Sequence, residues 1–481
     1  MNPADLFLEY WYKVRILSSS TLTRVMLPDE KFCLAVELSL SIDEGDQACT
    51  KIIDLISQQS VPLRKGAMLE VMRIIDEFFY RVHPRSILIN GQSGQRPPIP
   101  KWLQDTRDAR MFSGAYGTLN EHNLVPRGPL TRLPRDEFAS SGECLSDRFA
   151  ALSVVESKLK IDERPIAVRH IVRASSASEG VMPGAVAGAE TVTFVPVAQK
   201  ECHLKVTERS EEGRLFFNFL VAEGRDVKTC ITNALVAAAK TDIAFAPELM
   251  VTCTTADELA NELFTSPAEF RICILGSGAT VEREESEGGD EGQAWNESSV
   301  VNGNGTVLWR QRKLWQAGLD AKRASLYGLS DPGEKLLMED NCSGEEIVVA
   351  DIDGFGRCVI LICQDVEARP LADDLIRTYQ PDWVFIPILD SGIDIGRWAH
   401  QRTFGLSSLS PARFLIVSST ALADKCGLRD APCGMAVGPK ERTDQDQGRV
   451  VSLATVSADV EHGFANLTWR EDWGKTSLVE A

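Results

Sequence analysis

The sequence predicts a mixed α/β protein in which a mainly helical N-terminal region precedes an α/β layered domain. At 481 residues the chain is longer than one average domain. Apolar residues recur at three- and four-residue steps over residues 67–82, which is typical of an amphipathic helix. After residue 188, short β-branched runs alternate with helical segments, which favours layers of strands and helices. We therefore expect a helical region with a Pro/Gly-rich linker over 1–185 and the α/β domain over 186–481.

The N-terminal region opens with about 85 residues of helical pattern. In the run AMLEVMRIIDEFFYRV (67–82) one face is apolar: Met68, Val71, Ile74, Ile75, Phe78 and Phe79. The pair His83-Pro84 ends this helix, because proline disfavours helix in the residue before it. We expect a long loop over 90–141, a second helical segment over 145–159, and the domain boundary among the small residues of 175–188. No motif in this region points to chemistry.

Charge and composition exclude several classes of protein. The chain carries 69 acidic and 51 basic residues, a net charge of −18, which disfavours nucleic-acid binding through a broad basic surface. The opening MNPADLFLEYWYKVRIL does not resemble a signal peptide, and no apolar run is long enough for a bilayer. The 12 cysteines form no CxxC, and the six histidines show no metal-ligand spacing. We expect a cytoplasmic protein with reduced thiols, no membrane partner and no structural zinc.

The second region contains the strands and helices of the predicted α/β domain. In chain order they are VTFVPVA (192–198), VKTCITNALVAAAK (227–240), DIAFAPE (242–248), FRICILG (270–276), TVLWRQRK (306–313), CVILIC (358–363), RPLADDLIRTYQ (369–380), DWVFIPIL (382–389) and FLIVSST (414–420). An acidic, Gly-rich stretch at 281–295 is expected to be a solvated loop.

The segment 358–389 predicts a βαβ unit, and Cys363 ends its first strand. Ligands collect at the carboxyl ends of such strands, and a nearby helix N-terminus would favour a thiolate at Cys363. Taken alone, a cysteine at the end of a buried strand is more often a small core residue, as we expect of Cys358.

Residues at two other predicted strand ends could act together with Cys363. Glu248 closes the apolar strand IAFAPE, and Lys313 lies where TVLWRQRK runs out. A surface glutamate, a surface lysine and a core cysteine explain each residue separately. A thiol, a carboxylate and an ammonium on three strand ends can instead converge into a nucleophile, a base and an oxyanion stabiliser.

With these residues in place, residues 191–465 resemble the nitrilase or carbon–nitrogen hydrolase superfamily. The resemblance rests on APE (246–248), WNESSVVNGNGTVLWRQRKLW (295–315), GRCVILICQD (356–365), PDWVFIPILDSG (381–392) and CGMAVGPKERTDQDQGRVVSLA (433–454). These match, in order, the family's FPE, its strand before and through the lysine, its GxxICYD, the strand after it and its closing strands. Glu248, Lys313 and Cys363 fall on the family's three catalytic positions.

The resemblance implies a four-layer αββα sandwich and hydrolysis of a non-peptide C–N bond in an amide or nitrile through a thioester on Cys363. Glu248 would be the general base and Lys313, with a backbone N–H after Cys363, the oxyanion stabiliser, with no metal or organic cofactor. It also implies a homodimer or larger homo-oligomer. Gln364, Asp390, Ser391 and Trp398 are expected to line the substrate pocket, since ligands lie beyond strand ends.

The sequence departs from the family pattern at several points. Gln364 stands where the family has an aromatic residue. A second carboxylate after the lysine could be Asp320, Glu334 or Glu339, and Arg402 has Ser410 where a carboxylate partner is expected. These departures leave two alternatives to an active amidase: a catalytically weak binding or regulatory module on the same fold, and an acyltransferase that resolves the thioester with another nucleophile.

Overall fold

The computed structural model describes residues 1–22, 24–83, 98–128, 145–174, 190–238, 241–281, 294–353, 355–410, 412–439, 449–457, 459–468 and 476–479. The chain forms two compact units. One comprises Met1–Leu159, Val168–Val172 and Thr378–Gln380, and the other comprises Lys160–Ala167, Arg173–Arg377 and Pro381–Ala481. The domain boundary predicted among residues 175–188 and most of the acidic stretch at 281–295 lie outside the described residues.

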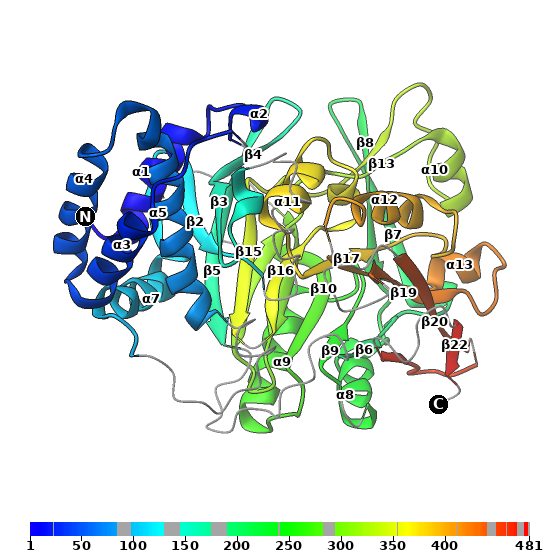
Figure 1. The fold of residues 1–481 in the computed structure, drawn as a ribbon. Coiled ribbons are helices and arrows are strands. Elements are labelled where there is room, and N and C mark those ends of the chain that lie inside the picture. Colours follow the sequence, from blue (N-terminus) through cyan, green and yellow to red (C-terminus); the bar gives the residue numbers. More distant parts are fainter. Residues whose placement is uncertain are drawn as a thin grey trace, which may run out of the picture. The chain divides into compact units, whose positions relative to one another are not determined.

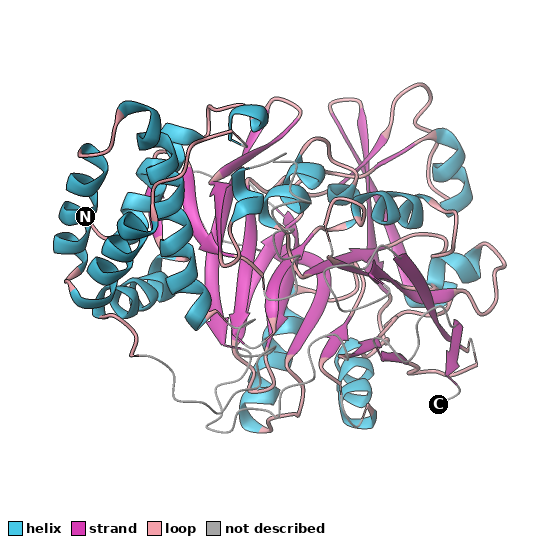
Figure 2. Ribbon diagram, viewed as in Figure 1, coloured by secondary structure: helices cyan, strands magenta, loops and turns pink. Residues whose placement is uncertain are grey.

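The first unit begins with helices, shown in Figures 1 and 2. These are α1 (Pro3–Val14), α2 (Ser19–Leu22), α3 (Glu30–Ile42), α4 (Gly45–Ser57), α5 (Val61–Val82) and α7 (Lys101–Ser113). A capping box starts α1, because the Asn2 side chain accepts from the Asp5 N–H at 3.0 Å and the Asp5 carboxylate accepts from the Asn2 N–H at 3.1 Å. The predicted amphipathic helix lies within α5, which ends at Val82 as expected from His83-Pro84.

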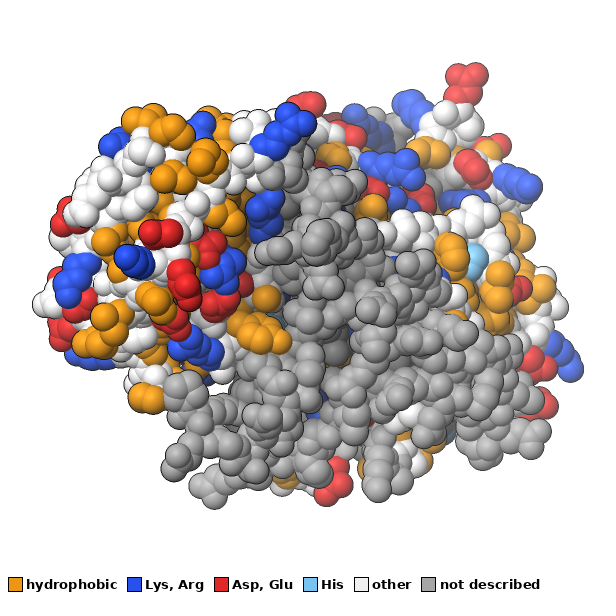
Figure 3. Space-filling view, in the orientation of Figure 1, with side chains coloured by type: hydrophobic (Ala, Val, Ile, Leu, Met, Phe, Trp, Pro, Cys, Tyr) orange, Lys and Arg blue, Asp and Glu red, His pale blue; other side chains and the backbone are white. Residues whose placement is uncertain are grey.

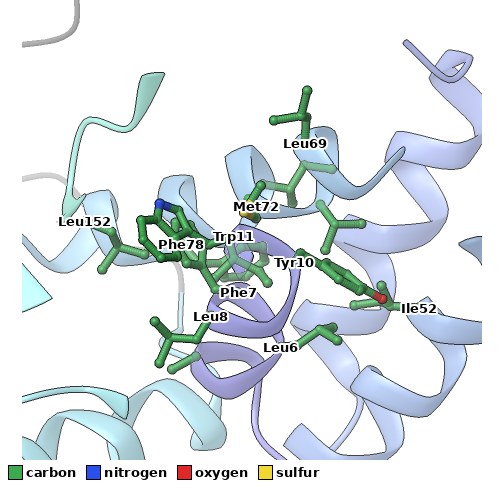
Figure 4. Close-up of a cluster of buried hydrophobic side chains, with 14 of the residues drawn as sticks. Leu6, Phe7, Leu8, Tyr10, Trp11, Ile52, Leu69, Met72, Phe78 and Leu152 are labelled. Atoms are coloured by element: carbon green, nitrogen blue, oxygen red, sulfur yellow. The ribbon is translucent and has the colours of Figure 1, made fainter. Parts of the chain in front are cut away.

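The core of this unit forms where α1 packs against α5 (Figure 4). Phe7 and Trp11 of α1 meet Met72 and Phe78 of α5, and Ile52 of α4 joins the same cluster. Burying each such large apolar side chain contributes roughly 1.5–3 kcal/mol. The apolar faces of the helices in the first 85 residues are therefore buried in one shared core, to which α3 also contributes Phe32, Val36 and Leu40.

The prediction of a second helix over 145–159 was wrong. A short 3-10 turn, η1 (Leu145–Arg148), precedes strand β3 (Leu152–Glu156), which pairs with β2 (His122–Pro126), itself paired with β1 (Gly117–Leu119). The buried Asp76 carboxylate of α5 accepts the backbone N–H groups of Ala150, Ala151 and Leu152 at 2.6–3.0 Å. These successive N–H groups are thus bonded to a carboxylate more than 70 residues away, and nothing in the local pattern signals that contact.

The predicted loop over 90–141 was also wrong in part, because its middle forms α7 and the β1–β2 hairpin. Pro100 stands at the N-cap of α7, and Gly114 ends the helix in the left-handed conformation with φ +77°. Proline and glycine thus mark the two ends of a helix here, where the sequence reading took them for loop residues.

No helix in the described part of the chain is long and apolar enough to cross a bilayer. On the face of the first unit seen in Figure 3, charged side chains are interspersed among apolar ones. Mixed surfaces of this kind are ordinary for helices that face water on one side.

The second unit is a mixed α/β structure with several sheets. One sheet has the order β12 (Val307–Arg312), β11 (Ala294–Val301), β10 (Ile272–Val281), β9 (Ile243–Phe245), β6 (Thr191–Phe194), β21 (Ala465–Thr468). Another runs β22 (Thr476–Val479), β20 (Arg449–Val456), β19 (Pro432–Pro439), β18 (Arg413–Ser418), β17 (Trp383–Ile388), β16 (Gly356–Ile360), β15 (Glu346–Asp353), and then the parts of β5 (Arg164–Ala174) and β4 (Lys158–Ile161) that belong to this unit. A smaller one runs β13 (Gly318–Leu319), β14 (Leu337–Glu339), β8 (Arg214–Val221), β7 (Leu204–Glu211).

The two larger sheets meet through apolar side chains. The ring of Phe245 on β9 lies 5.6 Å from that of Phe385 on β17, edge to face. Gly434 on β19 lies so close to the Phe194 ring of β6 that an added Cβ would fall 2.4 Å from it. The helices of this unit are α8 (Val227–Ala237), α9 (Cys253–Thr265), α10 (Ala321–Tyr327), α11 (Leu371–Tyr379), α12 (Trp398–Leu406) and α13 (Ala421–Lys425).

The predicted βαβ unit is present. Strands β16 and β17 are parallel, with Val359 opposite Val384, and they are joined by the 3-10 turn η3 (Cys363–Val366) and α11. In the first sheet, β9 is parallel to both β6 and β10. The carboxyl ends of β9 and β16, which precede Glu248 and Cys363, therefore belong to the two sheets that face each other.

Candidate active site

The structure brings Glu248, Lys313 and Cys363 together. Glu248 follows β9, Lys313 follows β12 directly, and Cys363 follows β16. The Lys313 ammonium donates to Glu248 Oε1 at 2.7 Å, and the negative charge of the same carboxylate acts on the Cys363 thiol. Glu248 and Lys313 are 2% and 1% exposed, whereas Cys363 is half-buried and lines a pocket. Three reactive groups from three strand ends thus share one site.

A second carboxylate, Glu339 at the end of β14, completes the cluster. Lys313 donates to Glu339 Oε2, and the Ala317 N–H donates to the same oxygen at 3.1 Å. Of the three carboxylates that the sequence left open, Asp320 instead caps α10 and Glu334 is exposed. Sequence reasoning could not choose Glu339, because β14 has only three residues and carries no motif around it.

Asn296 links the two carboxylates and was missed from the sequence. Its Nδ2 donates to Glu248 Oε1 at 3.1 Å and to Glu339 Oε1 at 2.8 Å. The Leu389 N–H donates to Glu248 Oε2 at 3.0 Å, so both oxygens of Glu248 are held. The four consecutive polar residues 296–299 of β11 are all buried in the fold, and Asn296 is 1% exposed, but the sequence does not show that burial.

Cys363 lies in a strained turn. Its φ of +47° is a left-handed conformation that residues with a Cβ seldom adopt and that persists at functional sites when the surroundings hold it. No hydrogen bond between described residues takes up the backbone N–H of the next residue, Gln364. That N–H is therefore available to an oxygen atom of a ligand bound at Cys363.

The buried carboxylate of Asp365 ties the turn of Cys363 to the strand of Lys313. It accepts the N–H groups of Leu314 at 3.0 Å, Trp315 at 2.8 Å and Ile362 at 3.2 Å. One fully buried side chain thus fixes the backbone on both sides of the nucleophile and beside the lysine. Burial raises the pKa of this carboxyl to about 7.

Replacing Asp365 by alanine is expected to lower the free energy of unfolding by about 3 kcal/mol, because three backbone N–H groups lose their acceptor. Urea unfolding of the wild type and the variant measures this. The half-exposed Asp374 of α11 provides a matched control, for which Asp374→Ala should cost less than about 0.5 kcal/mol. Equal losses for both variants would contradict the role given to Asp365.

Electrostatics set the resting state of the cluster. Burial, together with the nearby carboxylate of Glu339, raises the pKa of Glu248, although Lys313 opposes this. The two carboxylates outweigh burial at Lys313 and hold its pKa well above the ordinary value. Burial and the negative charge of Glu248 raise the pKa of the Cys363 thiol. The expectation of a thiolate at a helix N-terminus was wrong, because Cys363 begins only a single 3-10 turn beside a carboxylate.

We expect kcat/KM for substrate hydrolysis to rise with pH through a pKa above the ordinary 4.5 of glutamate, since Glu248 must be ionised to accept the thiol proton. Glu339→Gln removes a negative charge that raises the pKa of Glu248. The acid limb should therefore move to lower pH in this variant, which a pH–rate profile detects. A shift to higher pH would contradict the arrangement.

Arg402 pairs with a carboxylate that does not lie at the position expected from the family pattern. Its guanidinium pairs with Asp373 of α11 at 2.6 Å and donates to the Val366 carbonyl at 2.8 Å. The partner thus comes from the helix after the nucleophile, where residue 410 is serine. Arg402 holds the end of η3 and so supports the turn that begins at Cys363.

Cys363, Glu248, Lys313 and Glu339 open onto a pocket of about 150 Å³. Of the predicted lining residues, Gln364, Asp390 and Trp398 do line it, together with aromatic walls that the sequence did not predict: Phe217, Phe219 and Tyr327. Ser391 instead supports Asp390, to which it donates through its backbone N–H at 2.6 Å. Trp398 Nε1 also donates to Asp390 at 2.6 Å, so the Asp390 carboxylate is occupied by protein donors. No group of three His, Cys, Asp or Glu side chains suited to a metal ion occurs in the described part of the chain.

Comparison with known proteins finds no matching family model and no matching curated protein. Among solved structures, the chain is similar to Saccharomyces cerevisiae Nit3, a member of branch 10 of the nitrilase superfamily. The identity is 13%, covering 58% of this chain and 89% of Nit3, with a TM-score of 0.34. It is also similar to a variant of the amidase from Nesterenkonia sp. AN1 in complex with butyramide, with 12% identity over 60% of this chain and 94% of the amidase and a TM-score of 0.36. Because both the sequence identity and the TM-score are this low, any function has to be argued from the side chains of the site and not from the similarity to these structures.

Proposed function

We propose that this protein hydrolyses a non-peptide carbon–nitrogen bond of an amide-type substrate through a thioester on Cys363. The observation that carries the proposal is that Cys363, Glu248 and Lys313 line one pocket, where Lys313 donates to Glu248 and the charge of Glu248 acts on the Cys363 thiol. The buried carboxylate can act as the base for the neighbouring thiol, and the ammonium can stabilise negative charge that develops on the substrate. Neither group would be needed by a cysteine that merely fills a core.

In the first half of the reaction, Glu248 accepts the thiol proton while Sγ attacks the carbonyl carbon of the amide. The negative charge that develops on the carbonyl oxygen is stabilised by the Lys313 ammonium and by the N–H of Gln364. The C–N bond then breaks, and protonated Glu248 gives its proton to the leaving amine. The acyl group remains on Sγ as a thioester.

In the second half, Glu248 accepts a proton from water as the water oxygen attacks the thioester. The C–S bond breaks, the sulfur regains a proton, and the carboxylic acid leaves. Glu339 and Asn296 keep Lys313 and Glu248 in position through both halves. These positions are buried and hydrogen-bonded before substrate arrives, so little reorganisation is needed during the reaction.

The proposal extends to the architecture of the second unit as a four-layer αββα sandwich. The contact of Phe245 with Phe385 supports the two inner sheet layers. A homodimer or larger homo-oligomer and a cytoplasmic location stay predictions from the sequence.

Intact-mass analysis after incubation with a panel of small amides and nitriles tests the proposed function. Wild-type protein should gain the mass of an acyl group and lose it again as acid forms, whereas Cys363→Ala should gain nothing. An adduct that persists in water but transfers to an added amine or alcohol would favour an acyltransferase. No adduct on Cys363 with any amide, nitrile or thiol-directed reagent would sink the hydrolase proposal and favour a binding module.

A further inference from the structure

The rim of the pocket carries two opposite charges. Among the described residues that line the pocket, Arg323 of α10 and Glu367, which follows η3, are the exposed ones. The other lining residues are buried or half-buried. Arg323 and Glu367 therefore mark the mouth, and Cys363, Glu248 and Lys313 mark the base.

Both rim side chains are free to bind a ligand. In the part of the chain that the structure describes, neither the Arg323 guanidinium nor the Glu367 carboxylate has an ion-pair or hydrogen-bond partner; only their backbone N–H groups are bonded. The carboxylates deeper in the pocket differ, since Glu248, Glu339 and Asp390 all accept from protein donors. A charged substrate therefore finds its unpaired counter-charges only at the rim.

The size of the pocket limits what lies below the rim. A cavity of about 150 Å³ is the size that accommodates benzene, so the interior holds about six non-hydrogen atoms. A primary amide with a short, unbranched methylene chain fits that space against the rings of Phe217, Phe219 and Trp398. Any larger or charged substituent has to lie at the mouth, beside Arg323 and Glu367.

We propose that the substrate is a short ω-amide whose far carbon carries both a carboxylate and an ammonium group. Arg323 binds the carboxylate with its planar guanidinium, and Glu367 binds the ammonium. The amide end reaches Cys363 at the base. The hydrolysis of this amide rests on the function proposed above, whereas the recognition of its charges does not.

Four amides of similar length separate the contributions of the two charges. Butyramide carries neither, glutaramic acid carries the carboxylate, 4-aminobutyramide carries the ammonium, and glutamine carries both. We expect kcat/KM to be lowest for butyramide, higher for the two singly charged amides and highest for glutamine, which should be preferred over butyramide by about a hundredfold. A wild-type enzyme that turns over butyramide as well as glutamine would overturn the inference.

Substitutions at the rim assign each charge to its partner. Arg323→Gln should lower the glutamine-to-butyramide ratio of kcat/KM about tenfold and lower the ratio of glutaramic acid to butyramide, but not that of 4-aminobutyramide to butyramide. Glu367→Gln should lower the glutamine-to-butyramide ratio and the ratio of 4-aminobutyramide to butyramide, but not that of glutaramic acid to butyramide. Lys322→Gln on the same helix and Glu334→Gln remove like charges from exposed residues that do not line the pocket, and both ratios should stay at the wild-type value. Unchanged ratios in both rim variants would also overturn the inference.

Binding to Cys363→Ala distinguishes this inference from the proposed function. Calorimetric titration of this variant should show glutamine binding more tightly than butyramide, even if the wild type hydrolyses neither. Preferential binding without turnover or acylation in the wild type would refute the hydrolase proposal and leave the charge recognition standing. Hydrolysis of butyramide without any preference for charge would do the opposite.

Discussion

Cys363→Ala is expected to lower kcat for amide hydrolysis by about 10⁴-fold or more, to a level set by binding and by the oxyanion site alone. The loss is large because the thioester route disappears and water has to attack an amide directly. Substrate binding should survive, because Cys363 is only one of the residues that line the pocket and the others are unchanged. Steady-state kinetics, followed by direct measurement of Kd, separates the two effects.

Cys358→Ala is the matched control for this prediction. Cys358 lies five residues earlier, inside β16, where it is fully buried. Its thiol donates to the Gly356 carbonyl at 3.8 Å. Removing its sulfur should cost about 1 kcal/mol of stability through a small cavity and leave kcat within about twofold. A similar loss of kcat in both variants would mean that the effect comes from packing, and the role of Cys363 as nucleophile would be wrong.

Lys313→Met is expected to lower both activity and stability. The ammonium neutralises two buried carboxylates, so its removal leaves Glu248 and Glu339 facing each other and should cost about 3–5 kcal/mol of unfolding free energy. The rate of acylation should fall by about 10²–10³-fold, because the charge on the oxyanion loses its counter-ion. The fall should lie in kcat more than in KM, since the carbonyl oxygen becomes fully charged only in the transition state.

The double variant Lys313→Met/Glu339→Gln separates the two effects. It removes one of the facing carboxylates and should recover a large part of the stability, as judged by urea unfolding, without recovering the rate. Recovery of the rate together with stability would show that Lys313 only holds the site together. Loss of stability equal to that of the single variant would contradict the ion-pair geometry of the cluster.

The strand ends of the second unit could be read from the sequence, and much of the candidate site follows from them. Apolar runs end at or just before Glu248, Lys313 and Cys363, so local patterns suffice to place these residues at sheet edges. That all three edges meet at one point came from the family resemblance and from triad logic, and no periodicity carries that information. Their catalytic roles stay predictions until the experiments above are done.

The remaining parts of the site depend on contacts between residues far apart in the chain. Asn296 lies inside a strand, within the stretch 295–315 that carries the family resemblance, but no pattern there singles it out. Glu339 ends a strand of three residues that has no motif around it. Asp365 was visible beside the nucleophile, but its binding of the strand of Lys313 is a property of the folded chain. The same reason explains the errors in the first unit, where Asp76 of α5 holds the start of β3 and overrides the local pattern.

The two ion pairs of Lys313, with Glu248 and with Glu339, also determine how the reaction rate responds to ionic strength. With both glutamates ionised, the resting cluster has a net charge of −1, and passing the thiol proton to Glu248 leaves that total the same. Charge is relocated over a few ångströms inside a volume that dissolved ions do not enter. Added sodium chloride should therefore leave the acylation step unaffected, while any attraction of a charged substrate to the mouth weakens as the ionic atmosphere grows denser.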